Sequence, residues 1–284
     1  MKKKVTDYPE DITKLSKSVL LEIMTLLKGY SKNIVLVGGW VPYFLLQKFQ
    51  KDKEFKHIGS NDIDLVIDPE LIKSGVYESI VKIIEKNGYS QRNDELGNPI
   101  EFSFERKIND KEIRVDFLST AYPKKSKKRH RVVQPDLKAR TLKGARIVLK
   151  HNYEEEAEGN LPNGAHVKVK IKIADVVGCL TAKALALGGR SEAKDNYDIY
   201  AIITYYKDGE TSCAEEIKPF LGDKDIKEPL DDIKKNFEKE TSLGPILVGN
   251  FMYPNDREAR NRVIIDSFMR VNRFLKLLEY PKKT

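Results

Sequence analysis

Apolar and polar positions in the first part of the chain switch between helical and strand spacing. Residues 10–29 carry apolar side chains at helical spacing, and 33–37 form a short apolar run that is typical of a buried strand. Helical spacing returns over 40–50, with Pro42 tolerated in the first turn. Because Gly38-Gly39 separate the apolar run from the second helix, the pattern predicts a strand, a glycine turn and a helix.

The next segments predict further strands of the same sheet. Residues 61–68 alternate between polar and apolar, as a strand with one wet face does, and 70–87 have a helical pattern. Two more strands are expected over 100–106 and 112–119, joined by a turn at Asn109-Asp110. This order predicts an α/β (α+β) fold, in which helices pack against a mixed sheet.

The second half changes character near residue 170. Residues 166–173 alternate strictly and predict a half-buried strand. Helical patterns then follow over 174–187, 193–207, 226–240 and 257–279. We therefore expect two domains, an α/β domain over 1–170 and a mainly helical domain over 171–284.

Composition narrows the partners only partly. The chain has 284 residues, is 40% hydrophobic and carries a formal net charge of +8. Such a surplus favours a polyanionic partner such as nucleic acid, although many basic proteins bind nothing acidic.

Cysteine and histidine usage fits a reducing compartment. Cys179 and Cys213 are far apart, and the four histidines have no zinc-binding spacing. No apolar run approaches the roughly 18 residues that a bilayer span needs. We expect a soluble, cytoplasmic protein without a membrane partner.

Three aspartates are candidate metal ligands. Asp62 and Asp64 are two residues apart on one strand, so both side chains leave the same face, with Cα atoms roughly 7 Å apart. Asp116 lies on another strand and would complete a trio if the two strands are neighbours. Carboxylates aimed into one space suit Mg²⁺, and three can hold a pair of ions. The alternative is the wet face of an edge strand.

The glycine turn strengthens the metal hypothesis. Between a strand and a helix, the amides of Gly38 and Gly39 and the positive helix end can hold a triphosphate. A tight turn alone also needs glycine, so Gly-Gly by itself decides little. Gly-Gly followed by an Asp-x-Asp strand and a third strand-borne Asp is a stronger pattern.

These residues resemble the nucleotidyltransferase superfamily, the polymerase-beta-like fold, and within it most of all the AbiEii/AbiGii group. That group contains toxin components of bacterial toxin–antitoxin and abortive-infection systems. The resemblance covers roughly residues 30–205. The matching segments are Val37-Gly-Gly-Trp40, Ser60-Asn-Asp-Ile-Asp-Leu65, Val115-Asp-Phe117, Ala174-Asp-Val-Val-Gly-Cys-Leu-Thr-Ala-Lys183, and the segment from Arg190 to Lys194-Asp-Asn-Tyr-Asp198.

The resemblance implies roles for nine residues. Phosphates would be held by Gly38, Gly39 and Ser60, and Mg²⁺ (or Mn²⁺) by Asp62, Asp64 and Asp116. Lys183 would contact the phosphates of the nucleoside triphosphate, and Asp195 or Asp198 would orient it or assist at the site.

Without the resemblance, the last three residues have plainer interpretations. Lys183 lies in a helix rich in Ala and Leu and can extend its amine to solvent. Asp195 and Asp198 begin the next helix, where Asp195 is favoured by the helix dipole.

A basic stretch over 124–131 holds six Lys or Arg in eight positions. It is either a solvated loop or an arm that follows the phosphates of RNA, with tRNA favoured. The leading hypothesis is nucleotidyl transfer from a nucleoside triphosphate to such an RNA by a toxin-like enzyme with a possible cognate antitoxin. The rivals are a catalytically silent binding module and an aminoglycoside-like small-molecule nucleotidyltransferase.

Overall fold

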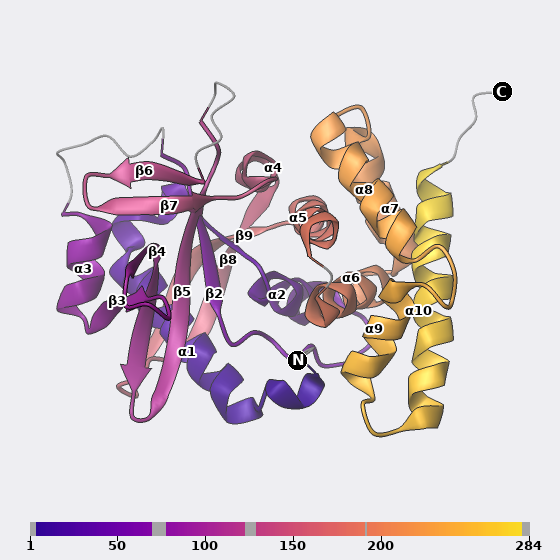
Figure 1. Cartoon of the computed structure of the whole chain (residues 1–284), viewed down its shortest axis with the longest axis horizontal. Coiled ribbons are helices and arrows are strands. Elements are labelled where there is room, and N and C mark those ends of the chain that lie inside the picture. The colour runs from indigo at the N-terminus through magenta and orange to yellow at the C-terminus, as the bar shows by residue number, and fades with distance from the viewer. Residues whose placement is uncertain (1–3, 70–77, 123–128, 191, 280–284) are drawn as a thin grey trace. The chain divides into compact units, whose positions relative to one another are not determined.

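The computed structural model describes residues 4–69, 78–122, 129–190 and 192–279 (Figure 1). The chain divides into two compact units. We call 10–40 with 60–174 the sheet unit, and 1–9, 41–59 and 175–284 the helical unit.

Nine strands of the described residues form one sheet, and all of them belong to the sheet unit. The strands are β1 (Ile34–Val37), β2 (Ile63–Ile67), β3 (Tyr89–Asn93), β4 (Pro99–Ile108), β5 (Lys111–Ser119), β6 (His130–Gln134), β7 (Leu137–Thr141), β8 (Asn152–Asn160) and β9 (His166–Ala174). Their order is β3-β4-β5-β2-β1-β9-β8, and β7 pairs with both β5 and β6.

The sheet is mixed. β2 runs antiparallel to β1 and parallel to β5, while β1 is parallel to β9. β4 and β5 form an antiparallel hairpin through Asn109, whose φ of 53° fits a tight turn. The prediction of a mixed α/β fold followed by a helical carboxyl-terminal part is confirmed.

Among the described residues, three α-helices accompany the sheet in this unit: α1 (Glu10–Leu26), α3 (Ile80–Lys86) and α4 (Ala145–Lys150). α1 packs against β5, β8 and β9 through fully buried side chains such as Val19, Leu20 and Ile23. Trp40 follows the glycine turn, and its indole Nε1 donates to Ser16 Oγ of α1 at 3.2 Å. The turn after β1 is therefore anchored to the core of the sheet unit.

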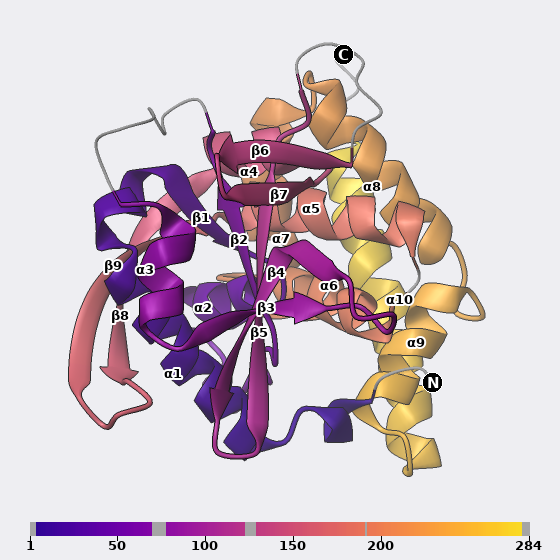
Figure 2. The ribbon, with the colours of Figure 1, turned by 60° about the vertical axis from the view of Figure 1, so that its left-hand side comes forward.

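β8 and β9 form a long hairpin (Figure 2), whose two strands carry opposite charges across from each other. Glu158 lies opposite Lys168, Glu156 opposite Lys170, and Glu154 opposite Lys172. The Lys168 amine lies 3.0 Å from the Glu158 carboxylate. Because the two strands stabilise each other in this way, an acidic segment forms a regular strand.

The helical unit contains α2 (Trp40–Phe49) from Val41 onward, α5 (Val176–Gly189), α6 (Ala193–Tyr205), α7 (Glu210–Ile217), α8 (Lys224–Asn236), α9 (Leu243–Met252) and α10 (Arg257–Leu278). α6 is buried along nearly its whole length and packs against α5, α9 and α10. The core of this unit includes Ile202, Phe251 and Phe274, all fully buried. Among the described helices, none is both long and apolar enough to cross a bilayer.

The division into units differs from the expected boundary near residue 170. The sheet unit ends at Ala174, and the segments 1–9 and 41–59 belong to the helical unit. The chain thus leaves the sheet after the glycine turn and returns to it at Ser60. The sequence pattern identified a helix over 40–50 but contained no signal for the unit with which that helix packs.

Candidate functional site

A row of four residues crosses the sheet from β1 to β4. Asp64 of β2 pairs in register with Val37 of β1 on one side and with Asp116 of β5 on the other. Asp116 in turn pairs with Ser103 of β4. Because register partners share a face of the sheet, two of the three predicted carboxylates are direct neighbours.

The glycine turn closes this row at β1. Gly38 follows Val37 directly and has a φ of +74°, a conformation that favours glycine. A Cβ built on Gly38 would lie 2.2 Å from Asp64 Oδ2, so any side chain there would collide with the carboxylate. Glycine is therefore needed at position 38 both for the backbone conformation and for the close approach of Asp64.

Asp116 is held firmly by its neighbours. Its side chain is buried, and Ser103 Oγ donates to Asp116 Oδ1 at 2.6 Å. Ser103 Oγ also accepts from Arg92 Nη1 at 3.2 Å. Ser103 is a site residue that the sequence did not identify, because only the pairing of β4 with β5 places it beside Asp116.

Asp62 has a different partner. Arg114 Nη2 donates to Asp62 Oδ2 at 2.6 Å, while Arg114 Nε lies 3.6 Å from Asp116 Oδ2. One guanidinium therefore contacts two of the three acids. The sequence held one signal of this contact: Arg114 and Asp116 are two residues apart in a strand, so their side chains share a face.

The convergence of all three aspartates on one ion stays a prediction. Within the described ranges, no group of three or more His, Cys, Asp or Glu side chains gathers closely enough to hold a metal ion. Asp64 and Asp116 are neighbours, but Asp62 is ion-paired with Arg114, a partner that the carboxylate pattern did not include.

Ser60 and Gly39 lie in the segments that flank these aspartates. Ser60 is buried, and its Oγ accepts from the Asp62 backbone N–H at 3.4 Å. Gly39 lies in the turn between β1 and α2, next to Gly38. The hydroxyl of Ser60 thus supports the backbone that leads into β2.

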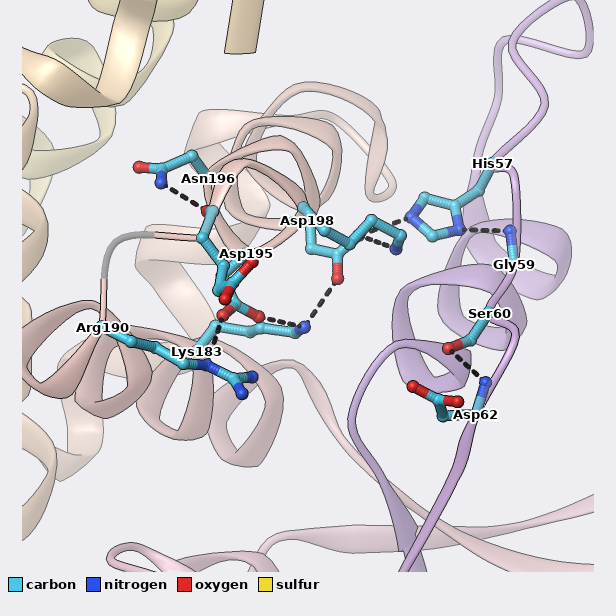
Figure 3. A network of polar contacts seen from close by, with 11 residues as sticks. His57, Gly59, Ser60, Asp62, Lys183, Arg190, Asp195, Asn196 and Asp198 are labelled. Atoms are coloured by element: carbon cyan, nitrogen blue, oxygen red, sulfur yellow. Dashed lines mark hydrogen bonds and ion pairs between the residues drawn. The ribbon is translucent and has the colours of Figure 1, made fainter. Parts of the chain in front are cut away.

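Lys183, Asp195 and Asp198 form a buried ion cluster inside the helical unit (Figure 3). The Lys183 amine on α5 lies 2.8 Å from Asp195 Oδ1 and 2.6 Å from Asp198 Oδ2, both on α6. Lys194 also pairs with Asp198, and Arg190 Nε lies 3.3 Å from Asp195 Oδ2. The alternative in which Lys183 extends its amine to solvent is wrong, because its side chain is 9% exposed and bound to two carboxylates.

His57 completes the cluster, and the sequence alone does not identify it as a site residue. His57 Nε2 lies 3.0 Å from Asp198 Oδ1, and His57 Nδ1 accepts from the Gly59 backbone N–H at 3.2 Å. Since Nδ1 acts as an acceptor, the proton is on Nε2, which donates to Asp198. Only the contact with α6 reveals this role, so no local signal existed.

Burial and charge shift the pKa values in the cluster. Burial, with Lys194 close by, lowers the pKa of His57 to about 4, so the ring is neutral at pH 7. Burial alone would favour neutral Lys183 and Asp198, but the opposite charges outweigh it. They raise the pKa of Lys183 above its ordinary value and lower that of Asp198. The cluster is therefore ionised and internally compensated.

Two smaller expectations concern the basic stretch and the thiols. Residues 124–128 lie outside the described residues, while His130 and Arg131 belong to β6. Arg131 is buried and donates to Thr120 Oγ1 at 2.6 Å, so this end of the stretch is not a solvated loop.

Cys179 and Cys213 are free and buried, and burial raises the pKa of both thiols.

In a comparison with models of protein families and with curated proteins, no family model and no curated sequence matches this chain. By its fold, the molecule is a mixed α/β protein, and two aspartates, Asp64 and Asp116, are neighbours on its sheet. The particular family therefore stays a hypothesis that rests on the motifs.

Proposed function

We propose that the sheet unit is the catalytic unit of a nucleotidyltransferase, which moves a nucleotide from a nucleoside triphosphate to an acceptor. One observation carries the proposal. The register row places Asp64 beside Asp116 and brings the Asp64 carboxylate against the Gly38 backbone. Carboxylates for a cation thus lie next to a glycine turn whose amides suit phosphate.

The residues of the row fit a divalent cation such as Mg²⁺ or Mn²⁺. Two neighbouring carboxylates repel each other unless a cation compensates them, and hard oxygen ligands of this kind suit these ions. Asp64 and Asp116 would hold the ion, and Asp62 would join them after leaving Arg114. A bound ion supplies activation of the attacking hydroxyl and neutralises charge on the phosphates.

The chain's other residues would position the nucleotide. The backbone amides of Gly38 and Gly39 would donate to phosphate oxygens, and Ser60 would keep the segment before β2 in place. Lys183, Asp195 and Asp198 support the fold of the helical unit through their ion pairs.

An RNA acceptor, with tRNA favoured, agrees with the net charge of +8. The toxin-like role and the cognate antitoxin follow only from the family resemblance and form part of the same proposal. Residues 124–131 would contribute to RNA binding through contacts with its phosphates.

The test is transfer of label. The full chain is incubated with Mg²⁺, total cellular RNA and each of the four α-³²P-labelled nucleoside triphosphates in turn. We expect one triphosphate to label an RNA species with release of pyrophosphate. Asp64→Asn and Asp116→Asn should reduce labelling by roughly a hundredfold or more, since each removes a carboxylate that would hold the cation.

Glu112→Gln is the matched control for these variants. Glu112 lies on β5 on the same face as Asp116 but pairs with Lys107 at the far end of the strand. It should keep wild-type labelling. Undiminished transfer in Asp64→Asn, or no labelled RNA with any triphosphate, would reject the proposed reaction.

A catalytically silent binding module is the second candidate, and the ion pair between Asp62 and Arg114 favours it. In that case the wild-type chain would bind RNA without transferring label. The same incubation followed by a filter-binding assay separates the two functions.

A further inference from the structure

Among the described residues, Arg114 is the one cation that contacts both Asp62 and Asp116. Its side chain is 38% exposed, and that of Asp62 is 29% exposed. The Nη2 contact with Asp62 is short at 2.6 Å, whereas the Nε contact with Asp116 is long at 3.6 Å. The guanidinium is therefore bound mainly to Asp62, the more solvent-exposed of the two aspartates.

The two acids depend on Arg114 to different degrees. Asp116 has 7% side-chain exposure and keeps the hydrogen bond from Ser103 whether or not Arg114 stays. Asp62 pairs with Arg114 in contact with water, where an ion pair contributes only about 1 kcal/mol or less. Arg114 can thus leave Asp62 at small cost while the rest of the row keeps its geometry.

A guanidinium and a divalent cation compete for the same carboxylates. Arginine cannot lose its proton in a protein, so its charge can be removed from the row only by movement of the side chain. A second cation at Asp62 would repel the guanidinium. A phosphate oxygen is a partner of the same geometry as a carboxylate, and arginine binds both through paired N–H groups.

We propose that Arg114 is an exchangeable counter-cation: a divalent cation takes Asp62 from it, and the released guanidinium then binds a phosphate of the nucleoside triphosphate. The inference rests on the proposed function, because it requires a metal and a polyphosphate at the row. In this role Arg114 positions the nucleoside triphosphate, and it does so only after exchanging Asp62 for a phosphate.

The exchange predicts opposite effects on two ligands. Without Arg114, Mn²⁺ alone should bind more tightly, because Asp62 is already available to it. Polyphosphate should bind more weakly in the presence of Mn²⁺, because a charged hydrogen-bond donor is lost. A structural role for Arg114 would change both affinities in the same direction or leave both unchanged.

The experiment measures Mn²⁺ binding by electron paramagnetic resonance and inorganic tripolyphosphate binding by calorimetry at saturating Mn²⁺. Arg114→Met should raise the Mn²⁺ affinity about fivefold and lower the tripolyphosphate affinity about tenfold or more. Arg114→Lys should leave the Mn²⁺ affinity close to wild type. Its tripolyphosphate affinity should lie between the other two, because lysine keeps the charge without the paired donors.

Two further variants complete the design. Lys111→Met is the matched control: it removes one positive charge from β5 at a residue that pairs with Asp11, and neither affinity should change. Asp64→Asn should abolish Mn²⁺ binding. Circular dichroism melting confirms that each variant is folded.

The outcomes separate the two proposals. Mn²⁺ binding that needs Asp64 but is unaffected by Arg114→Met would overturn the exchange and leave the proposed metal site standing. Loss of both ligands in a folded Arg114→Met protein would also overturn it. If the wild-type chain binds no Mn²⁺, the proposed function and the exchange both fail.

Discussion

The two units each contain a group of carboxylates and cations, and the groups differ in access to water. In the helical unit, Lys183, Asp195 and Asp198 have side chains at most 9% exposed. In the sheet unit, Asp62 and Arg114 are about one-third exposed. In the first group, water cannot reach the side chains to replace a lost partner. In the second group, water can hydrogen-bond to a side chain that loses its partner. Burial therefore assigns a structural role to the first group and leaves the second able to exchange partners.

The largest expected effect tests the buried group. Asp198→Ala removes the acceptor shared by Lys183, Lys194 and His57, which leaves buried charge without compensation. We expect the free energy of unfolding to fall by about 3–5 kcal/mol. Urea denaturation followed by circular dichroism measures it.

Asp208→Ala is the control for that variant, because Asp208 pairs with Lys51 at an exposed position of the same unit. Its cost should stay below about 1 kcal/mol. Equal losses in the two variants would contradict the contrast between buried and exposed groups.

Acid should weaken the buried group through His57. The folded pKa of His57 is about 4, below its ordinary value of 6.5, so between these pH values the unfolded chain takes up a proton that the folded chain does not. The free energy of unfolding should therefore fall as pH falls from about 6.5 to about 4, by at most roughly 3 kcal/mol. The lowered pKa of Asp198 continues the loss at lower pH.

Urea denaturation at several pH values between 7 and 4 measures this slope. His57→Gln, which removes the titrating ring, should have a shallower dependence over the same range. A slope that is identical in wild type and His57→Gln would show that other groups cause the acid sensitivity.

The smallest expected effect is a difference in stability between two glycine variants of the sheet unit. Gly38→Ala places a methyl group against the Asp64 carboxylate, while Gly97→Ala, at a φ of +83°, meets nothing within 4 Å. Both variants incur the cost of a left-handed conformation, about 1–2 kcal/mol. Gly38→Ala should cost about 1–3 kcal/mol more because of the collision.

Comparing the two variants in urea isolates the contact at Asp64, since the backbone cost is common to both. Mn²⁺ affinity should fall in Gly38→Ala alone, because the Asp64 carboxylate must rotate away from the added methyl group. Equal stabilities would mean that Asp64 does not depend on the glycine turn.

Much of the fold could be predicted from local spacing. The strands over 33–37, 61–68 and 112–119 and the helix over 257–279 closely match β1, β2, β5 and α10. β8 was not predicted, because its segment is rich in glutamate and lacks the alternation of apolar and polar residues; only the pairing of its glutamates with lysines of β9 explains the strand. Such pairing is a property of the sheet and not of the segment.

The candidate site could be predicted only in part, for the same reason. The period of two placed Asp62 and Asp64 on one face, and the same rule would have pointed to Arg114. It could not say that Asp62 pairs with that arginine, nor that Lys183 is enclosed by α6. Those facts depend on which elements become neighbours after folding.

The charge ladder of the β8–β9 hairpin has one more consequence. In the part of the chain that the structure describes, β8 is the last strand of the sheet, and a terminal strand is where another strand can join. Three of its glutamates, Glu154, Glu156 and Glu158, are exposed and repeat every second residue. A second molecule approaching with the same edge would bring like charges together, so the ladder that holds the hairpin also opposes aggregation of the protein through its sheet.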